Sequence, residues 1–223
     1  MRGLVSERTH NVMEKRPGLK DRRRRIEAVE AKVGSTYFNQ HFNATVHQVN
    51  QGGYCVLVQS EDMIMTTLGS CISVCVYDPL IRVGGMNHFL LPENKGAETK
   101  NDFSMRYGNN AMEYLINDIL RCGGQRERLV LKAFGAGNVL KIKADIGAKN
   151  IEFLHQYVKA ENLYLETCDL GGNYPRRVAF CPSTGKVFVR ILRRTSDLNI
   201  VAQETKFRNR IEQETLGGEV ELF

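Results

Sequence analysis

The stretch from residue 72 to residue 91 is predicted to form one β-hairpin, which constrains the fold more than any other feature. Ile72–Tyr77 is rich in β-branched and aromatic residues, Asp78-Pro79 is typical of a turn, and Val83–Leu91 is a second apolar run. In an antiparallel ladder the numbers of facing residues sum to a constant. A turn centred near residues 79 and 80 therefore predicts that Cys71 lies opposite His88 or Phe89.

A thiol beside an imidazole can form a nucleophilic site, in which the histidine takes the proton and the thiolate attacks. Gly69 and Ser70 come just before Cys71, so a tight turn there could aim backbone N–H groups at an oxyanion. The alternatives stay open at this point. Cys71 could be a buried small apolar residue, as Cys75 is expected to be, and His88 could be a hydrogen-bonded core histidine.

A third group is expected to orient the imidazole. Thr66 and Thr67 lie on the predicted strand that leads into the Cys71 turn, and either hydroxyl could hydrogen-bond the ring. Threonine also suits strands for structural reasons alone, so the residues by themselves do not decide.

Two glycine-rich loops are predicted to serve the backbone. Gly135-Ala136-Gly137 lacks the pattern of a phosphate-binding loop and the third glycine of a dinucleotide fingerprint. Gly171-Gly172-Asn173 indicates positive φ angles. Either loop could still form a wall of a substrate cleft.

The composition predicts one domain with extensions. The chain has 223 residues, of which 42% are hydrophobic. It holds no apolar run of the length that crosses a bilayer and no apolar segment typical of a secretory signal. We therefore expect a cytoplasmic protein without direct membrane insertion.

The positive charge is concentrated at the N-terminus. Residues 1–32 hold ten Lys and Arg against five Asp and Glu, a net charge of +5, which leaves +1 of the total of +6 for the rest. A binding face for nucleic acid on the core is therefore not expected. Residues 1–35 are predicted to be a basic, disordered extension, 36–200 the main domain and 201–223 a C-terminal tail.

Neither a metal site nor a disulfide framework is expected. The six cysteines contain no C-x-x-C pair, and the five histidines show no ligand spacing.

The order of predicted elements indicates a layered α/β fold. Strands are expected at 54–58, 63–68, 129–134 and 164–167, and a last hairpin joins 178–180 to 186–191. Two long amphipathic helices are expected at 104–121 and from about 146 to 160. Because hairpins and helix crossovers both occur, the sheet should be mixed. Residues 36–52 show no clear periodicity and are expected to be an ordered lead-in.

Several separated motifs together resemble the CheD family, the chemoreceptor glutamine deamidases of bacterial chemotaxis. The resemblance covers about residues 36–195, and its motifs are LGSC, VGGMNHFLLP, IGAKNIEFL (146–154) and DLGGNYPRRVAFCPSTGKVFVR (169–190). It implies an α/β fold similar to the catalytic domain of cytotoxic necrotizing factor toxins.

The resemblance also implies an activity and its residues. Family members hydrolyse the side-chain amide of selected glutamines in methyl-accepting chemotaxis receptors and release ammonia without a cofactor. By position, the nucleophile is Cys71, the general base is His88 and the third residue is a threonine, for which we choose Thr66 over Thr67. The phosphatase CheC is an expected partner of many members.

Another class of function remains as the alternative. The chain could be a non-catalytic binding or regulatory component of the chemotaxis array.

Overall fold

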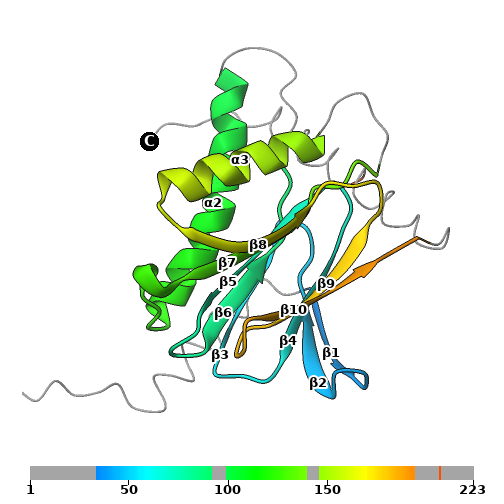
Figure 1. Cartoon of the computed structure of the whole chain (residues 1–223), viewed down its shortest axis with the longest axis vertical. Helices are drawn as coiled ribbons and strands as arrows, with labels where there is room; N and C mark the ends of the chain where they lie inside the picture. Colours follow the sequence, from blue (N-terminus) through cyan, green and yellow to red (C-terminus); the bar gives the residue numbers. More distant parts are fainter. Residues whose placement is uncertain (1–33, 92–98, 140–145, 194–205, 207–223) are drawn as a thin grey trace, which may run out of the picture.

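The computed structural model describes residues 34–91, 99–139, 146–193 and 206, and these form three layers (Figure 1). Two helices cover one face of a five-stranded sheet, and a second five-stranded sheet lies against its other face. The helices are α2 (Thr99–Arg121) and α3 (Ile146–Ala160), and a short 3-10 turn, η1 (Arg126–Arg128), precedes β7.

The sheet in the middle layer has the strand order β3-β6-β5-β7-β8. Its strands are β3 (Tyr54–Val58), β5 (Ile72–Asp78), β6 (Val83–Asn87), β7 (Val130–Gly135) and β8 (Tyr164–Leu170). All neighbours are antiparallel except β7 and β8, which run parallel. We call it the central sheet.

The outer sheet has the order β1-β2-β4-β9-β10. Its strands are β1 (Ser35–Asn39), β2 (Ala44–Gln48), β4 (Met63–Leu68), β9 (Arg176–Cys181) and β10 (Lys186–Ile191). Here only β2 and β4 are parallel. The predicted mixed α/β architecture with two long helices is confirmed, but the strands divide into two sheets. The expectation for residues 36–52 was incomplete, because β1 and β2 form an edge of the outer sheet.

Two buried clusters hold the layers together, one on each face of the central sheet. Between the helices and this sheet lie Ile72, Val74, Phe89, Phe153 and others, and between the two sheets lie Cys71, Cys75, Leu90, Phe180 and others. All seven residues of β5 are buried. This strand is therefore apolar almost without interruption, as expected for a strand covered on both faces.

Two glycines follow the end of α2. Gly123 has φ of 99° and donates its N–H to Leu120, while Gly124 donates to the carbonyl of Ile119 at 3.0 Å. These two bonds form a Schellman motif, in which a residue with positive φ follows the last helical turn.

The hairpin of β5 and β6 is confirmed, but its predicted register is wrong. Val76 pairs with Gly85, and Ile72 exchanges two backbone hydrogen bonds with Phe89, so paired numbers sum to 161. Continued by one residue, this register places Cys71 opposite Leu90. His88 is then one diagonal step from Cys71, on the same face of the ladder.

The reason for the shift lies in the turn. The last pair is Asp78 with Val83, so four residues form the loop, and the turn is centred later than predicted. The carboxylate of Asp78 accepts the N–H of Leu80, and Arg82, at φ 57°, donates its N–H to the carbonyl of Asp78. A side chain that caps its own turn thus sets the loop length.

The buried carboxylate of Asp78 also forms an ion pair with Arg128. Arg128 donates several hydrogen bonds to its carboxylate, and the N–H of Gln125 donates another. Burial alone would raise the pKa of Asp78, but these bonds, together with that from Leu80, outweigh it and hold the pKa below its ordinary value.

Both predicted ends of the domain stay predictions. Residues 1–33 and 194–223, apart from Lys206, lie outside the described part of the chain, and so do the basic extension and the tail. None of the described helices is long and apolar enough to cross a membrane.

Candidate active site

Cys71 lies where the chain crosses from the outer sheet to the central sheet. Strand β4 ends at Leu68 and β5 begins at Ile72, so only three residues make the crossing. All three are buried, and Cys71 is fully so. A connection this short holds the cysteine at the seam between the two sheets.

The three carbonyl groups of this crossing each accept a hydrogen bond from another segment. Gly69 accepts the N–H of Gly137 at 2.7 Å, and Cys71 accepts that of Ala136 at 2.6 Å. The carbonyl of Ser70 accepts the side-chain amide of Asn150 at 3.0 Å. Since a peptide unit is planar and trans, the N–H groups of Ser70 and Cys71 point away from these partners.

His88 contacts Thr66 across the space between the sheets. Thr66 Oγ1 lies 2.7 Å from His88 Nδ1, and the same hydroxyl donates to the carbonyl of Val49 at 2.8 Å. Both side chains are buried. A hydroxyl has one hydrogen, so Thr66 must accept from Nδ1–H, and in the neutral ring Nε2 then carries the lone pair.

Thr66 is thus the threonine that the structure brings to the imidazole. On β4, Ile64, Thr66 and Leu68 face the central sheet, because Ile64 and Leu68 belong to the cluster between the sheets. Side chains alternate along a strand, so the half-buried Thr67 lies on the outer face.

The thiol of Cys71 lies on the same side of the central sheet as His88. Cys71 belongs to the cluster between the sheets, and the bond to Thr66 shows that His88 points into the same space. Diagonal neighbours of an antiparallel pair are close enough for long side chains to meet. The structure therefore places Cys71, His88 and Thr66 in the space between the two sheets, with Cys71 and His88 one diagonal step apart and Thr66 bonded to His88.

Gln51 is a neighbour of the thiol that sequence reasoning missed. Its Nε2 lies 3.8 Å from Cys71 Sγ. Gln51 sits in a turn whose next two residues bond the His88 backbone: Gly52 donates to the His88 carbonyl, and His88 donates to the carbonyl of Gly53. Gln51 is half-buried, whereas Cys71 is fully buried, so this amide is a partly exposed neighbour of a buried sulfur.

Cys75 provides a contrast on the same face of β5. It is fully buried, and burial raises the pKa of its thiol, although nearby Lys132 acts in the opposite direction. A thiol with a raised pKa stays protonated and unreactive at neutral pH. Cys75 thus fits the role of a buried apolar residue.

The first glycine loop supports the crossing. Gly135 has φ of 110°, and a Cβ atom there would lie 2.3 Å from the carbonyl oxygen of Cys71. Only glycine allows this approach. This loop therefore serves the backbone, as the sequence predicts, and supports Cys71.

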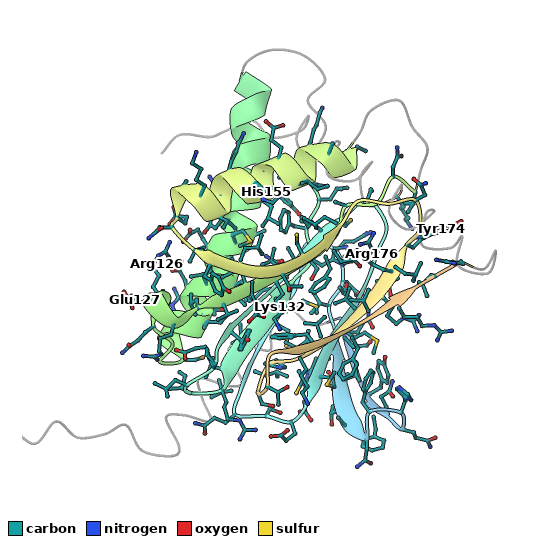
Figure 2. All side chains as sticks on the ribbon, in the orientation of Figure 1. Arg126, Glu127, Lys132, His155, Tyr174 and Arg176 are labelled. Carbon is teal, nitrogen blue, oxygen red and sulfur yellow. The ribbon has the colours of Figure 1, made fainter. Side chains whose placement is uncertain are left out.

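The second glycine loop supports the first. Gly171 and Gly172 have φ of 78° and 80°, as predicted, and Gly171 donates its N–H to Gly135 at 2.8 Å. Arg176, which is 3% exposed, donates to the carbonyls of Asp169 and Gly171. Arg176 is the first residue of β9 and is labelled in Figure 2. The buried guanidinium of Arg176 thus fixes the second glycine loop, which in turn bonds the first glycine loop beside Cys71.

Sequence reasoning indicated Cys71, His88 and two threonines as candidates from residue types and spacing, and it missed the neighbours that contacts between distant segments bring to them. Asn150 lies inside the IGAKNIEFL motif, which marks it but assigns it no role, and the turn beginning at Asn50 was not connected to the site. Among the residues that the structure describes, no group of His, Cys, Asp and Glu could hold a metal ion.

A buried thiol, an imidazole with a fixed tautomer and backbone N–H groups beside the thiol are the groups used by cysteine-dependent hydrolases. Comparisons with known proteins are consistent with this class. A family model described as CheD chemotactic sensory transduction matches residues 90–191.

Relatives cover most of the chain. A probable chemoreceptor glutamine deamidase CheD of Rhodopseudomonas palustris is 46% identical over 189 residues, which cover 84% of this chain and 88% of the relative. A protein of the same name from Halorhodospira halophila is 39% identical and covers 91% of this chain and 97% of its own. The chain belongs to the CheD family.

Among solved structures, a hypothetical protein of Bacillus licheniformis, YfiH, is 12% identical with a TM-score of 0.35 and covers 67% of this chain and 70% of its own. A likeness of this size carries no argument about fold or function. The expected similarity to the toxin catalytic domain therefore stays a prediction.

Proposed function

We propose that this protein hydrolyses the side-chain amide of glutamines in chemoreceptors, with Cys71 as the nucleophile, His88 as the base and Thr66 as the residue that orients His88. One observation carries the proposal: Thr66 bonds His88 Nδ1 from the opposite sheet, on the face of the central sheet where Cys71 lies. This bond leaves Nε2 as the basic nitrogen. The names of the relatives supply the substrate class.

The chemistry then proceeds in two steps. His88 Nε2 takes the thiol proton, and the thiolate attacks the carbonyl carbon of the glutamine side chain. When the C–N bond breaks, protonated His88 gives its proton to the leaving nitrogen and ammonia departs. Water, deprotonated by His88, hydrolyses the thioester, which yields glutamate and restores the thiol of Cys71. Neither step requires a cofactor.

The developing oxyanion requires donors, and the crossing supplies candidates. The carbonyls of Gly69 and Ser70 are held by Gly137 and Asn150, so the N–H groups of Ser70 and Cys71 point to the opposite side. Preorganised backbone donors of this kind are worth about 10²- to 10³-fold in rate. We assign the oxyanion site to this segment, with Gly69 providing the turn.

Substrate must displace a cover to reach the sulfur. Cys71 is fully buried, and the half-buried amide of Gln51 lies 3.8 Å from Sγ. Rotation of the Gln51 side chain would open the sulfur to a glutamine that enters from solvent. The substrate amide then replaces an amide of the same kind.

We place this activity in the cytoplasm, on the cytoplasmic domains of membrane-embedded receptors. CheC is a proposed regulatory partner, and co-purification with purified CheC is its test. If unrelated control proteins retain as much CheC as this protein does, the proposed partnership is refuted.

The test of the activity is mass spectrometry of receptor cytoplasmic domains incubated with the protein, together with an ammonia assay. The wild type should convert selected glutamines to glutamates with one ammonia released for each. Cys71→Ala should abolish both products, whereas Cys75→Ala, a change of equal size on the same face, should retain them. Equal product from Cys71→Ala would refute the assignment. Receptor binding without any turnover by the wild type would favour a non-catalytic component of the array.

A further inference from the structure

The side chain of Asn150 joins the two segments that carry the proposed nucleophile and base. It is fully buried on α3 and donates from Nδ2 to the carbonyl of Ser70 at 3.0 Å. Its Oδ1 accepts the N–H of Leu91 at 2.9 Å, three residues after His88. Because a carbonyl can only accept and a backbone N–H can only donate, both partners require this one orientation of the amide.

The bond to Ser70 acts on the peptide unit that contains the N–H of Cys71. The carbonyl of Ser70 and the N–H of Cys71 belong to one planar unit and point in opposite directions. Holding the carbonyl towards α3 therefore turns this N–H away from the helices. The thiol of Cys71 also faces away from the helices, in the cluster between the sheets.

We propose that Asn150 is a positioning residue that fixes the Ser70–Cys71 peptide so that its N–H binds the oxyanion formed at Cys71. This inference rests on the proposed nucleophilic role of Cys71. It assigns Asn150 to the step in which negative charge develops on the attacked carbonyl oxygen. The reactivity of the sulfur itself does not depend on it.

Two reactions of the same sulfur separate these roles. Iodoacetamide alkylates a thiolate by displacing iodide at a saturated carbon, and no oxyanion forms. p-Nitrophenyl acetate acylates it through a tetrahedral oxyanion, after which the C–O bond breaks and p-nitrophenolate leaves. The ratio of acylation rate to alkylation rate at Cys71 therefore reports oxyanion binding, and differences in access to the sulfur largely cancel.

The variants are chosen to keep the fold. Asn150→Asp retains an acceptor for the N–H of Leu91 but places an oxygen against the carbonyl of Ser70. Asn150→Leu removes both bonds at similar volume. Leu154→Ala, at a buried position one turn further along α3, is the matched control, since it weakens packing without touching the crossing. Thermal unfolding identifies any variant that does not fold. If Asn150→Leu does not fold, the result for Asn150→Asp decides the test.

We expect Asn150→Asp to lower the acylation-to-alkylation ratio at least about tenfold, while alkylation stays within about threefold of the wild type. Leu154→Ala should leave the ratio unchanged. An unchanged ratio in Asn150→Asp, a parallel fall of both rates, or an equal fall in Leu154→Ala would overturn the proposal. So would a wild-type Cys71 that is alkylated but not acylated. Failure of the proposed function would be seen in a different measurement, as the absence of receptor deamidation by the wild type.

Discussion

Replacing Thr66 by valine tests the proposed site most directly, because valine has nearly the same shape and lacks only the hydroxyl. The hydroxyl accepts from His88 Nδ1 at 2.7 Å and donates to the carbonyl of Val49 at 2.8 Å. Thr66→Val therefore removes two buried hydrogen bonds and creates no cavity. His88 loses the contact that determines which of its nitrogens carries the proton.

The size of the effect follows from these two bonds. A buried polar group left without its partner costs about 1–3 kcal/mol, so the two groups together should lower the free energy of unfolding by roughly 2–6 kcal/mol. If the part of this free energy that comes from the Thr66–His88 bond also stabilises the transition state, kcat should fall about 10- to 100-fold, because about 1.4 kcal/mol corresponds to a factor of ten.

Two further variants make the measurement specific. Thr66→Ser keeps the hydroxyl and loses one methyl group, so it should cost roughly 1 kcal/mol of stability and keep kcat within about threefold. Thr67→Val makes the same chemical change on the outer face of β4, where Thr67 pairs with Arg177, and kcat should be unaffected. The assay is ammonia release from receptor domains, with urea unfolding for stability. A folded Thr66→Val enzyme with wild-type kcat, or an equal loss in Thr67→Val, would refute the reasoning.

Three other predictions follow from the structure. Gly135→Ala should lower the urea midpoint more than Gly171→Ala. Both have positive φ, but the new Cβ meets the Cys71 carbonyl in the first and nothing within 4 Å in the second; equal midpoints would show that the close approach is unimportant. Because the pKa of Asp78 is lowered on folding, its ionised form stabilises the fold at neutral pH, and this contribution is lost as the pH falls below about 4. Asp78→Asn should therefore have a lower free energy of unfolding at neutral pH, and its stability should fall less than that of the wild type when the pH is lowered below about 4. Urea midpoints at neutral pH and below about pH 4 measure both effects, and a fall as large as that of the wild type would contradict this. Gln51→Ala should speed alkylation of Cys71 by iodoacetamide, because the cover is removed; a slower reaction would mean that the amide activates the sulfur instead.

Much of the secondary structure was determined by local sequence. Strands β3 and β4 begin and end where their apolar runs do, and Gly123 ends α2 because a residue of positive φ can follow a helix there. The hairpin of β5 and β6 was also readable, since its strands are neighbours in the chain. These features depend on residues only a few positions apart, and the pattern of side chains reports them directly.

The register of that hairpin shows where local reasoning ends. The two apolar runs indicated pairing, but the loop length depends on hydrogen bonds of the Asp78 carboxylate, which residue types alone do not reveal. The predicted facing of Cys71 and His88 therefore became a diagonal relation on the same face.

Only the tertiary structure decided which residues surround the thiol. The sequence by itself indicated Cys71, His88 and two threonines, and the resemblance to the family supplied a chemistry for them. The choice of Thr66 over Thr67 follows from the stacking of two sheets, and the roles of Gln51 and Asn150 follow from contacts between segments far apart in the chain. Contacts of this kind leave no periodic trace in the sequence, because each depends on how whole layers pack against one another.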